Sequence, residues 1–489
     1  MMGLIERKNR YIALLLTVLL VFITAGCGKG GSGTESRESK DDSGQEMTVT
    51  PTMVPDTPTL TAVPDTPTPT AMPDTPTPTA MPDTPTPTAM PDTPTPTPAE
   101  STPTVLKMWH DRTSPFEIEI YKKVAAELAE KYPNITLEIE VIDMSGYRNL
   151  LAGIKRADEL PDIFLVLGDM SFQNLMKQGL VSCFDDVYPQ YEEKLAEKMC
   201  EAYSLEGKKY AAPSVMNAVV MYANMDVLAQ VGYTAIPKTW DEMKNCCELL
   251  IDAGKIPFAI SGRETWCLEE YLESIALRTC GEEELRKIFY GEATWNNEGI
   301  VEAVDLLQEM KQKGYFGWNY GEIYNDQVKE AFMEGNRYAF YVNGSWDVSW
   351  FEKSDSKITA EPFPVFDTSK SEYNRLIGGP GDAFAVSSAT KNPEIAKQYA
   401  MDFAQLISRY LYLAEEAYPV WAVDYDCSEL SVMRQQMAEM LLNTDSFLFY
   451  CDTVIPTEEL MVYAVETGRI LEDTMTGKQY AEKLAEGIR

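Results

Sequence analysis

The chain has 489 residues, of which 45% are hydrophobic, and this is enough apolar material for a large core built from two domains. Its formal net charge of -34 disfavours nucleic acid as a partner, although the total charge does not decide whether a neutral solute binds in a cleft. His110 is the single histidine, which excludes multi-histidine metal sites and, unless His110 is the base, Ser-His-Asp and Cys-His catalysis, and the absence of a CxxC pair leaves a zinc cluster without support. We expect no metal, no cofactor and no catalytic residues.

Residues 1–27 have the pattern of a secretory signal. Basic residues at the start are followed by the apolar run from Tyr11 to Ile23 and then by Thr24-Ala25-Gly26-Cys27. This ending resembles a bacterial lipobox, apart from Thr24, where Leu, Val or Ile is usual. The resemblance implies that Cys27 carries the lipid, palmitate included, and anchors the chain to the extracytoplasmic face of a cell membrane, as in Gram-positive bacteria. An uncleaved membrane helix is the alternative.

Residues 28–103 form a linker that contains repeats of Pro-Asp-Thr-Pro-Thr-Pro-Thr-Ala-Met. The copies begin at Pro55, Pro64, Pro73, Pro82 and Pro91. Because proline removes amide donors and fixes φ, we expect a disordered, extended Pro/Thr-rich stalk without helix or sheet. Such a spacer suits a domain that is displayed away from a membrane.

The folded body begins with alternating strands and helices. Residues 105–109 predict a strand, and the capping box from Ser114 to Glu117, with Pro115 at the first helical position, predicts the start of a helix. The residues expected on the buried face of this helix recur every three or four positions. They are Ile118, Tyr121, Ala125, Leu128 and Tyr132.

Two further strands complete this first lobe. Residues 135–141 alternate as a strand, residues 147–156 predict a short helix, and residues 163–167 form the apolar run typical of a parallel strand covered on both faces. The order β-α-β-α-β predicts an open doubly wound sheet, which binds ligands beyond the carboxyl ends of its strands. Those ends carry His110, Asp111, Arg112, Gly168 and Asp169.

A second α/β lobe is predicted further along the chain. Residues 219–222 and 338–342 have the character of strands, and Thr239 is placed to cap a helix between them. Asn343 and Gly344 predict a tight turn that leads to Trp346. The cysteines of the folded body allow either disulfides or free buried thiols.

Several short motifs follow one another in a fixed order through residues 104–489. They are Pro161-Asp162-Ile163-Phe164, Gly207-Lys208-Lys209-Tyr210-Ala211-Ala212-Pro213, Tyr222-Ala223-Asn224-Met225-Asp226, Pro237-Lys238-Thr239-Trp240, Phe332-Met333-Glu334-Gly335, Asn343-Gly344-Ser345-Trp346, Gly378-Gly379 and Asn392-Pro393-Glu394. In this order they resemble the extracellular family 1 solute-binding proteins of carbohydrate ABC importers, of which the maltose-binding members are the best known.

The resemblance implies a monomer of two doubly wound α/β lobes that close on a sugar or oligosaccharide and deliver it to a membrane permease. The expected lobes are residues 104–216 with 379–417, and residues 217–378 with 418–489. The hinge residues expected between them are Asn217, Gly378, Gly379, Gly381 and Pro419. Hinge closure buries a solute that neither lobe encloses alone.

The resemblance also implies the site. Trp346 coincides with a sugar-stacking tryptophan of the family, and Asp169 with an aspartate that binds hydroxyls, although Asp169 also suits a helix N-cap. The other residues expected to contact the ligand are Trp266 with Arg263 and Glu264, Asp111, His110, Tyr147, Asp382 and Tyr463. Core packing is the alternative for Trp266 and Tyr147, a surface position for His110 and a turn for Asp382.

Two tryptophans of the maltose-binding members are missing here. An aliphatic residue near Val166 replaces one, and Met461-Val462-Tyr463 occupies the region of the other. These departures speak against maltodextrin but not against a carbohydrate of another shape. The alternatives are a surface-displayed glycan-binding adhesin or sensor, an anchored glycoside hydrolase with two carboxylates across the sugar, and a binding protein for polyamines or metals.

Overall fold

The structure is a computed structural model that describes residues 103–488 apart from 318, 367–371 and 473. The predicted signal with Cys27, and the stalk apart from Pro103, lie outside the described residues. Residues 101–489 belong to one compact unit, so the division of this unit into two lobes stays a prediction.

Ten strands form one sheet in the order β2-β1-β3-β10-β6-β8-β7, with β9 and β11 paired to β6 and β12 paired to β10. These strands are β1 (Thr104–His110), β2 (Ile135–Val141), β3 (Ile163–Leu167), β6 (Ala211–Asn224), β7 (Ile256–Ala259), β8 (Tyr338–Gly344), β9 (Ile358–Glu361), β10 (Arg375–Val386), β11 (Tyr418–Pro419) and β12 (Ser446–Leu448). A separate hairpin consists of β4 (Ser204–Leu205) and β5 (Lys208–Lys209).

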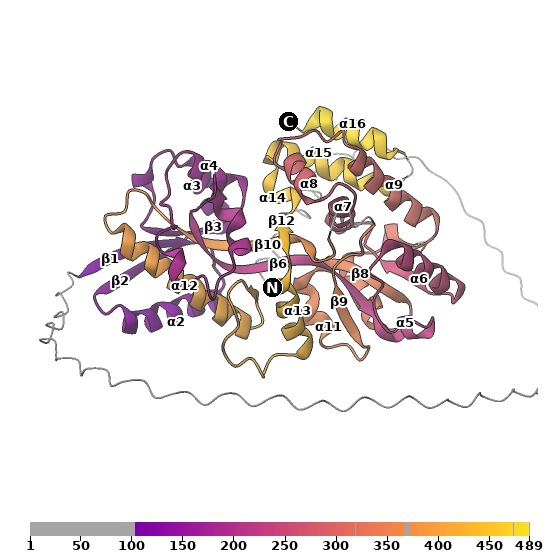
Figure 1. Ribbon diagram of the computed structural model, residues 1–489, viewed down its shortest axis with the longest axis horizontal. Coiled ribbons are helices and arrows are strands. Elements are labelled where there is room, and N and C mark those ends of the chain that lie inside the picture. The colour runs from indigo at the N-terminus through magenta and orange to yellow at the C-terminus, as the bar shows by residue number, and fades with distance from the viewer. Residues whose placement is uncertain (1–102, 318, 367–371, 473, 489) are drawn as a thin grey trace, which may run out of the picture. The chain divides into compact units, whose positions relative to one another are not determined.

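Helices cover this sheet (Figure 1). They are α2 (Pro115–Lys131), α3 (Met144–Gly153), α4 (Met170–Lys177), α5 (Met225–Gln230), α6 (Trp240–Asp252), α7 (Thr265–Thr279), α8 (Glu282–Phe289), α9 (Glu298–Gln312), α10 (Asn325–Met333), α11 (Val348–Phe351), α12 (Pro393–Leu413), α13 (Val432–Asn443), α14 (Cys451–Val454), α15 (Thr457–Gly468) and α16 (Gly477–Gly487). The short 3-10 helices η3 (Glu197–Tyr203) and η5 (Ser345–Asp347) also matter for the site.

The predicted β-α-β-α-β start is confirmed. Strand β1 pairs in parallel with both β2 and β3, and the apolar run in β3 is almost completely buried. Figure 1 shows α2 on one side of these strands and α3 and α4 on the other. The carboxyl ends of β1 and β3 therefore point toward the same edge of the sheet, where the sequence places His110 and Asp169.

The capping signals predict helix starts well, but the buried face of α2 is shifted. Ser114 caps α2 and Thr239 caps α6, each through its side-chain oxygen. The residues of α2 that are fully buried are Ile120, Tyr121, Val124 and Leu128, whereas Ile118 and Ala125 are only partly covered. The helix packs on α12 as well as beside β2, so its apolar stripe turns toward both elements. The next helix, α3, begins earlier than expected because Asp143 accepts a bond from the Gly146 amide.

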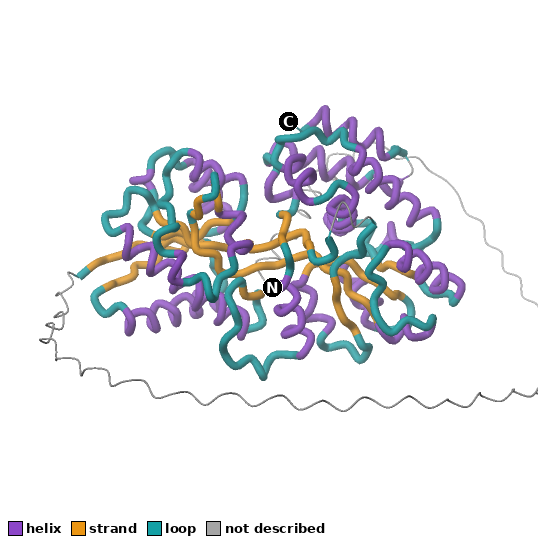
Figure 2. Tube along the Cα trace, in the orientation of Figure 1, coloured by secondary structure: helices purple, strands orange, loops and turns teal. Residues whose placement is uncertain are grey.

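Strands β6 and β10 carry the chain from one end of the sheet to the other. The C-terminal part of β10 pairs with β3 and with the N-terminal part of β6. The C-terminal part of β6 pairs with β8, and the N-terminal part of β10 pairs with β12. Figure 2 shows these strands passing through the middle of the sheet, with helices on both sides. Gly378 and Gly379 pair with Ala218 and Asn217, in the antiparallel segment where β6 and β10 cross side by side from one end of the sheet to the other.

This crossing requires glycine. The φ angles of Gly378 and Gly379 are 120° and 125°, a region that L side chains rarely adopt. A Cβ atom on Gly378 would lie 2.4 Å from the carbonyl oxygen of Asn217. The two strands are therefore in close contact where the sequence predicts a hinge.

The described residues contain eight cysteines, all of them free thiols. No helix among these residues is long and apolar enough to cross a membrane.

Candidate functional site

An ion-pair cluster lies at the carboxyl end of β1. The guanidinium of Arg112 contacts Asp111 Oδ1 at 3.1 Å and Asp382 Oδ2 at 2.5 Å. Asp382 comes from β10, where it pairs with Leu167 of β3. The structure thus brings together three predicted site residues, His110, Asp111 and Asp382, through an arginine that the sequence places beside them.

Burial and neighbouring charges together determine the protonation of His110 and Arg112 in this cluster. His110 is 1% exposed, not a surface residue, and its ring centroid lies 4.0 Å from that of Tyr121. Burial and the charge of Arg112 lower the pKa of His110 to about 3, so the imidazole is neutral. Burial also opposes the charge of Arg112, but attraction to Asp382 and Asp111 outweighs it and raises the pKa of the guanidinium above its usual range. A permanently charged arginine therefore faces two carboxylates.

Asp169 and Tyr147 border a small cavity beside this cluster. The cavity has a volume of about 20 Å³, and Asp111, Leu167 and Arg148 also line it. Asp169 caps α4 by accepting a bond from Phe172 N at 3.0 Å, so its N-cap role is confirmed. The hydroxyl of Tyr147 donates to the Leu165 carbonyl at 2.6 Å, which ties α3 to β3. The cavity has room for about one water, and a larger solute would need the surrounding elements to move.

Trp346 lies after β8, as predicted, but the expected Asn-Gly turn is wrong. Asn343 and Gly344 belong to the strand, and Trp346 lies in η5. Gly344 is extended, with φ -72° and ψ 155°, and a Cβ atom there would overlap the Trp346 ring. The Asn-Gly pair therefore makes room for the indole instead of reversing the chain. Within the described residues, the buried Trp346 Nε1 has no hydrogen-bond partner.

Trp266 lies in the first turn of α7 and is partly buried. Its Nε1 donates to Glu264 Oε1 at 3.4 Å. Arg263 is exposed and lies over the Tyr324 ring, 4.8 Å from its centroid. The segment therefore presents an indole, a carboxylate and an exposed cation.

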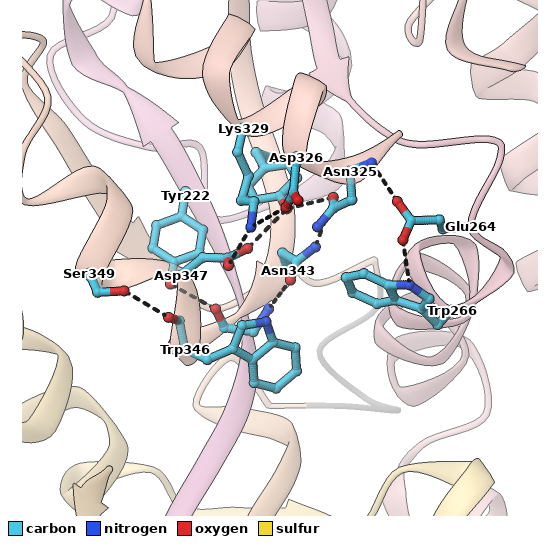
Figure 3. A network of polar contacts seen from close by, with 12 residues as sticks. Tyr222, Glu264, Trp266, Asn325, Asp326, Lys329, Asn343, Trp346, Asp347 and Ser349 are labelled. Atoms are coloured by element: carbon cyan, nitrogen blue, oxygen red, sulfur yellow. Dashed lines mark hydrogen bonds and ion pairs between the residues drawn. The ribbon is translucent and has the colours of Figure 1, made fainter. Parts of the chain in front are cut away.

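A polar network connects the two tryptophan segments (Figure 3). Glu264 Oε2 accepts the backbone N–H of Asn325 at 2.5 Å, and Asn325 Oδ1 accepts from Tyr341 at 2.8 Å. Tyr341 also contacts Asp347 Oδ2 at 3.0 Å, immediately after Trp346. In the view of Figure 3, both indoles lie below this network.

Sequence reasoning missed two aromatic residues that follow β12. The Phe449 ring lies so close to Gly168, after β3, that a Cβ atom there would be 2.7 Å from it. The Tyr450 ring centroid is 6.3 Å from that of Trp346. Residues 449–450 thus contact both the β3 end and the Trp346 side. The sequence signal that could have found them is the aromatic-rich segment Phe447-Leu448-Phe449-Tyr450.

The structure buries the side chain of Tyr463 in the core. It is fully buried, donates to Glu273 Oε1 at 2.8 Å and packs on Trp295. It therefore offers no surface to a solute in this structure.

The fold and the site define a class of protein. Aromatic rings and paired charges lie at the carboxyl ends of parallel strands, where open α/β sheets bind ligands. The family model for bacterial extracellular solute-binding proteins matches residues 123–427. The chain belongs to this family.

Named relatives agree with this assignment. The chain is 25% identical to maltodextrin-binding protein MdxE of Bacillus subtilis over 292 residues, 58% of this chain and 66% of that protein. It is 23% identical to the multiple sugar-binding protein of Streptococcus mutans over 299 residues, 59% of this chain and 69% of that protein. The chain thus spans just under two thirds of the length of the first relatives that it matches.

Solved structures share the fold. Apo RafE from Streptococcus pneumoniae superposes with a TM-score of 0.64 at 18% identity, covering 80% of this chain and 98% of RafE. The predicted mixed α/β fold of solute-binding proteins is confirmed. The matched relatives and neighbours are binding proteins, so the glycoside hydrolase alternative has no support from them.

Proposed function

We propose that this chain is the substrate-binding lipoprotein of an ABC importer and that it captures a sugar or oligosaccharide for a membrane permease. The observation that carries the proposal is the polar network that holds Trp346 and Trp266 in one part of the fold. Indole faces bind the apolar C–H faces of sugars, and polar groups around them bind hydroxyls. The names of the relatives MdxE and multiple sugar-binding protein agree with a carbohydrate ligand.

The ligand is proposed to lie between two lobes, residues 104–216 with 379–417 and residues 217–378 with 418–489. Asp111, Asp169, Asp382 and His110 would contribute from the first lobe, and Trp346, Trp266, Arg263 and Glu264 from the second. The crossing of β6 and β10 at Asn217, Gly378 and Gly379, with Gly381 and Pro419 nearby, would be the hinge. Closure would enlarge the contact between ligand and protein on both sides of the cleft.

A ligand screen tests this function. Residues 104–489 are titrated with mono- and oligosaccharides, with polyamines, divalent metals and peptides as controls, and unfolding is followed by thermal shift. A sugar at a hundred times its dissociation constant stabilises the fold by about 2.7 kcal/mol, a shift of a few degrees.

Two variants make the test specific. Trp346→Ala is expected to weaken sugar binding strongly but measurably, so that most of the thermal shift at the sugar concentration used for the wild type is lost. Trp240→Ala is the matched control, because Trp240 stacks on Phe363 and is buried in packing, so it should lower stability but keep the shift. Silence across the carbohydrate panel, or a sugar returned hydrolysed, contradicts the proposal.

The lipid anchor is tested separately in the full chain. Cys27→Ala is expected to move the protein from the membrane fraction to the medium and to abolish labelling by radioactive palmitate. Labelling that persists in the variant would place the lipid on another residue, whereas a variant that stays in the membrane fraction without labelling would favour an uncleaved helix.

A further inference from the structure

Asn325 occupies the point where the two tryptophan segments meet. It is the first residue of α10 and is 1% exposed. Its main chain contacts the Trp266 segment, and its side chain contacts the Trp346 segment (Figure 3). Neither contact follows from the neighbours of Asn325 in the sequence.

The link to Trp266 uses an amide that the helix itself cannot satisfy. The first N–H groups of a helix have no partner within it, and the helix dipole favours a negative charge there. Glu264 supplies that charge, because its Oε2 accepts the Asn325 N–H at 2.5 Å while its Oε1 accepts Trp266 Nε1. One carboxylate thus connects the start of α10 to the indole.

The link to Trp346 runs through the Asn325 side chain. Its Oδ1 accepts from Tyr341 at 2.8 Å and from Asn343 at 3.5 Å. Asn343 Oδ1 in turn accepts the Gly344 amide at 2.8 Å, and Tyr341 contacts Asp347. These contacts hold the backbone at Gly344, two residues before Trp346, and the side chain of Asp347, directly after it.

We propose that Asn325, together with Glu264, is a positioning residue that sets the two indoles relative to each other. This proposal rests on the proposed function for its effect on binding, since a sugar that contacts both rings needs them at a fixed spacing. Holding both rings in advance reduces the ordering that binding would otherwise require. Losing the Asn325 side chain should therefore weaken binding by about tenfold, the effect of one additional immobilised side chain.

The first test needs no ligand. The chain has eight tryptophans, and labelling with 5-fluorotryptophan gives each a 19F resonance that is assigned by single Trp→Phe changes. Asn325→Ala keeps the backbone N–H that Glu264 accepts but removes the side-chain contacts that hold the start of α10 to Tyr341 and Asn343. It is therefore expected to shift the Trp346 resonance directly and the Trp266 resonance through the released helix start and Glu264. The control is Asn224→Ala, since Asn224 is fully buried and caps α5 without contacting either indole, and it should leave both resonances in place. Unchanged resonances in folded Asn325→Ala overturn the proposal.

The second test uses the sugar found by the ligand screen. Asn325→Ala is expected to weaken its binding about tenfold in the wild-type background but less than about twofold in Trp346→Ala, because the residue acts through that indole. A full tenfold loss in both backgrounds means a general structural role and overturns the proposal. If Asn325→Ala does not fold, Glu264→Gln keeps the shape of the side chain but removes one acceptor, and it should shift the Trp346 resonance as well as that of its direct partner Trp266. A shift confined to Trp266 overturns the proposal.

The two proposals fail in different ways. A wild-type protein that binds no sugar contradicts the proposed function, yet the 19F resonances still decide the coupling of the indoles. A wild-type protein that binds sugar while Asn325→Ala leaves resonances and affinity unchanged contradicts only the positioning role.

Discussion

Glu273 should make the stability of the fold depend on pH in the neutral range. It lies on α7, is 3% exposed, and accepts bonds from Tyr463 at 2.8 Å and from the Cys451 amide at 3.2 Å. Burial, followed by repulsion from Asp452, raises the pKa of Glu273 from 4.5 to about 8. The folded state therefore holds a proton that the unfolded chain releases at lower pH.

The sign and size of this pH dependence follow from the linkage between proton binding and folding. Because the folded pKa is raised, the contribution to stability is fully present below pH 4.5 and is lost as pH rises through about 8. At about 1.4 kcal/mol for each pKa unit, the upper limit is roughly 5 kcal/mol, and structural relaxation reduces it to about 2–3 kcal/mol. Glu273→Gln keeps the shape of the side chain but removes the titration.

Urea unfolding between pH 5 and pH 9 measures the effect. The difference in unfolding free energy between Glu273→Gln and wild type should grow in favour of the variant as pH rises. Glu283→Gln is the control, because Glu283 is exposed on α8. The stability of this variant should depend on pH in the same way as that of the wild type. Parallel profiles for wild type and Glu273→Gln would refute the reasoning.

Two further predictions concern the strand crossing and the ion-pair cluster. Gly378→Ala should cost at least about 2 kcal/mol of stability, because its φ is 120° and the new Cβ would meet the carbonyl of Asn217. Gly381 has open space around it, so Gly381→Ala should change the stability measured by urea titration by no more than about 0.5 kcal/mol. Equal effects of the two would contradict the strained crossing. Arg112→Met should cost about 3–5 kcal/mol of stability, because it leaves two carboxylates without their cation. Arg156, whose side chain is 69% exposed, is the control, and Arg156→Met should cost under about 1 kcal/mol. A small effect of Arg112→Met in thermal unfolding would show that the cluster is not desolvated.

Local features of the fold were predictable because they depend on neighbouring residues. Ser114 and Thr239 cap helices through bonds to amides three residues later, and the apolar run in β3 identifies a covered strand. Asp169 shows the limit of this reasoning, since an N-cap and a ligand contact use the same residue type in the same position. The structure shows the cap directly.

The site was less predictable because its contacts span long sequence separations. The bond between Glu264 and Asn325 joins residues 61 positions apart, and Phe449 reaches Gly168 from another region altogether. Resemblance to a family pointed to the segment that contains Tyr463, but it could not tell which side of the helix this residue occupies. The structure shows that Tyr463 lies on the buried side. Likewise, Asn343 and Gly344 have the composition of a turn, but pairing of β8 with β6 keeps them extended.

The same buried network explains why the Trp346 platform should exist before any ligand arrives. Lys329 forms an ion pair with Asp347 at 3.4 Å, and the two residues are only 3% and 2% exposed. Lys329 also contacts Asp326 and lies over the Trp350 ring. Buried ion pairs contribute little net stability, but breaking one is costly, so a satisfied network restricts the surrounding chain to one arrangement. Asp347 directly follows Trp346, and the constraint therefore reaches the indole through the backbone. Conformational freedom during binding would then belong mainly to the crossing of β6 and β10.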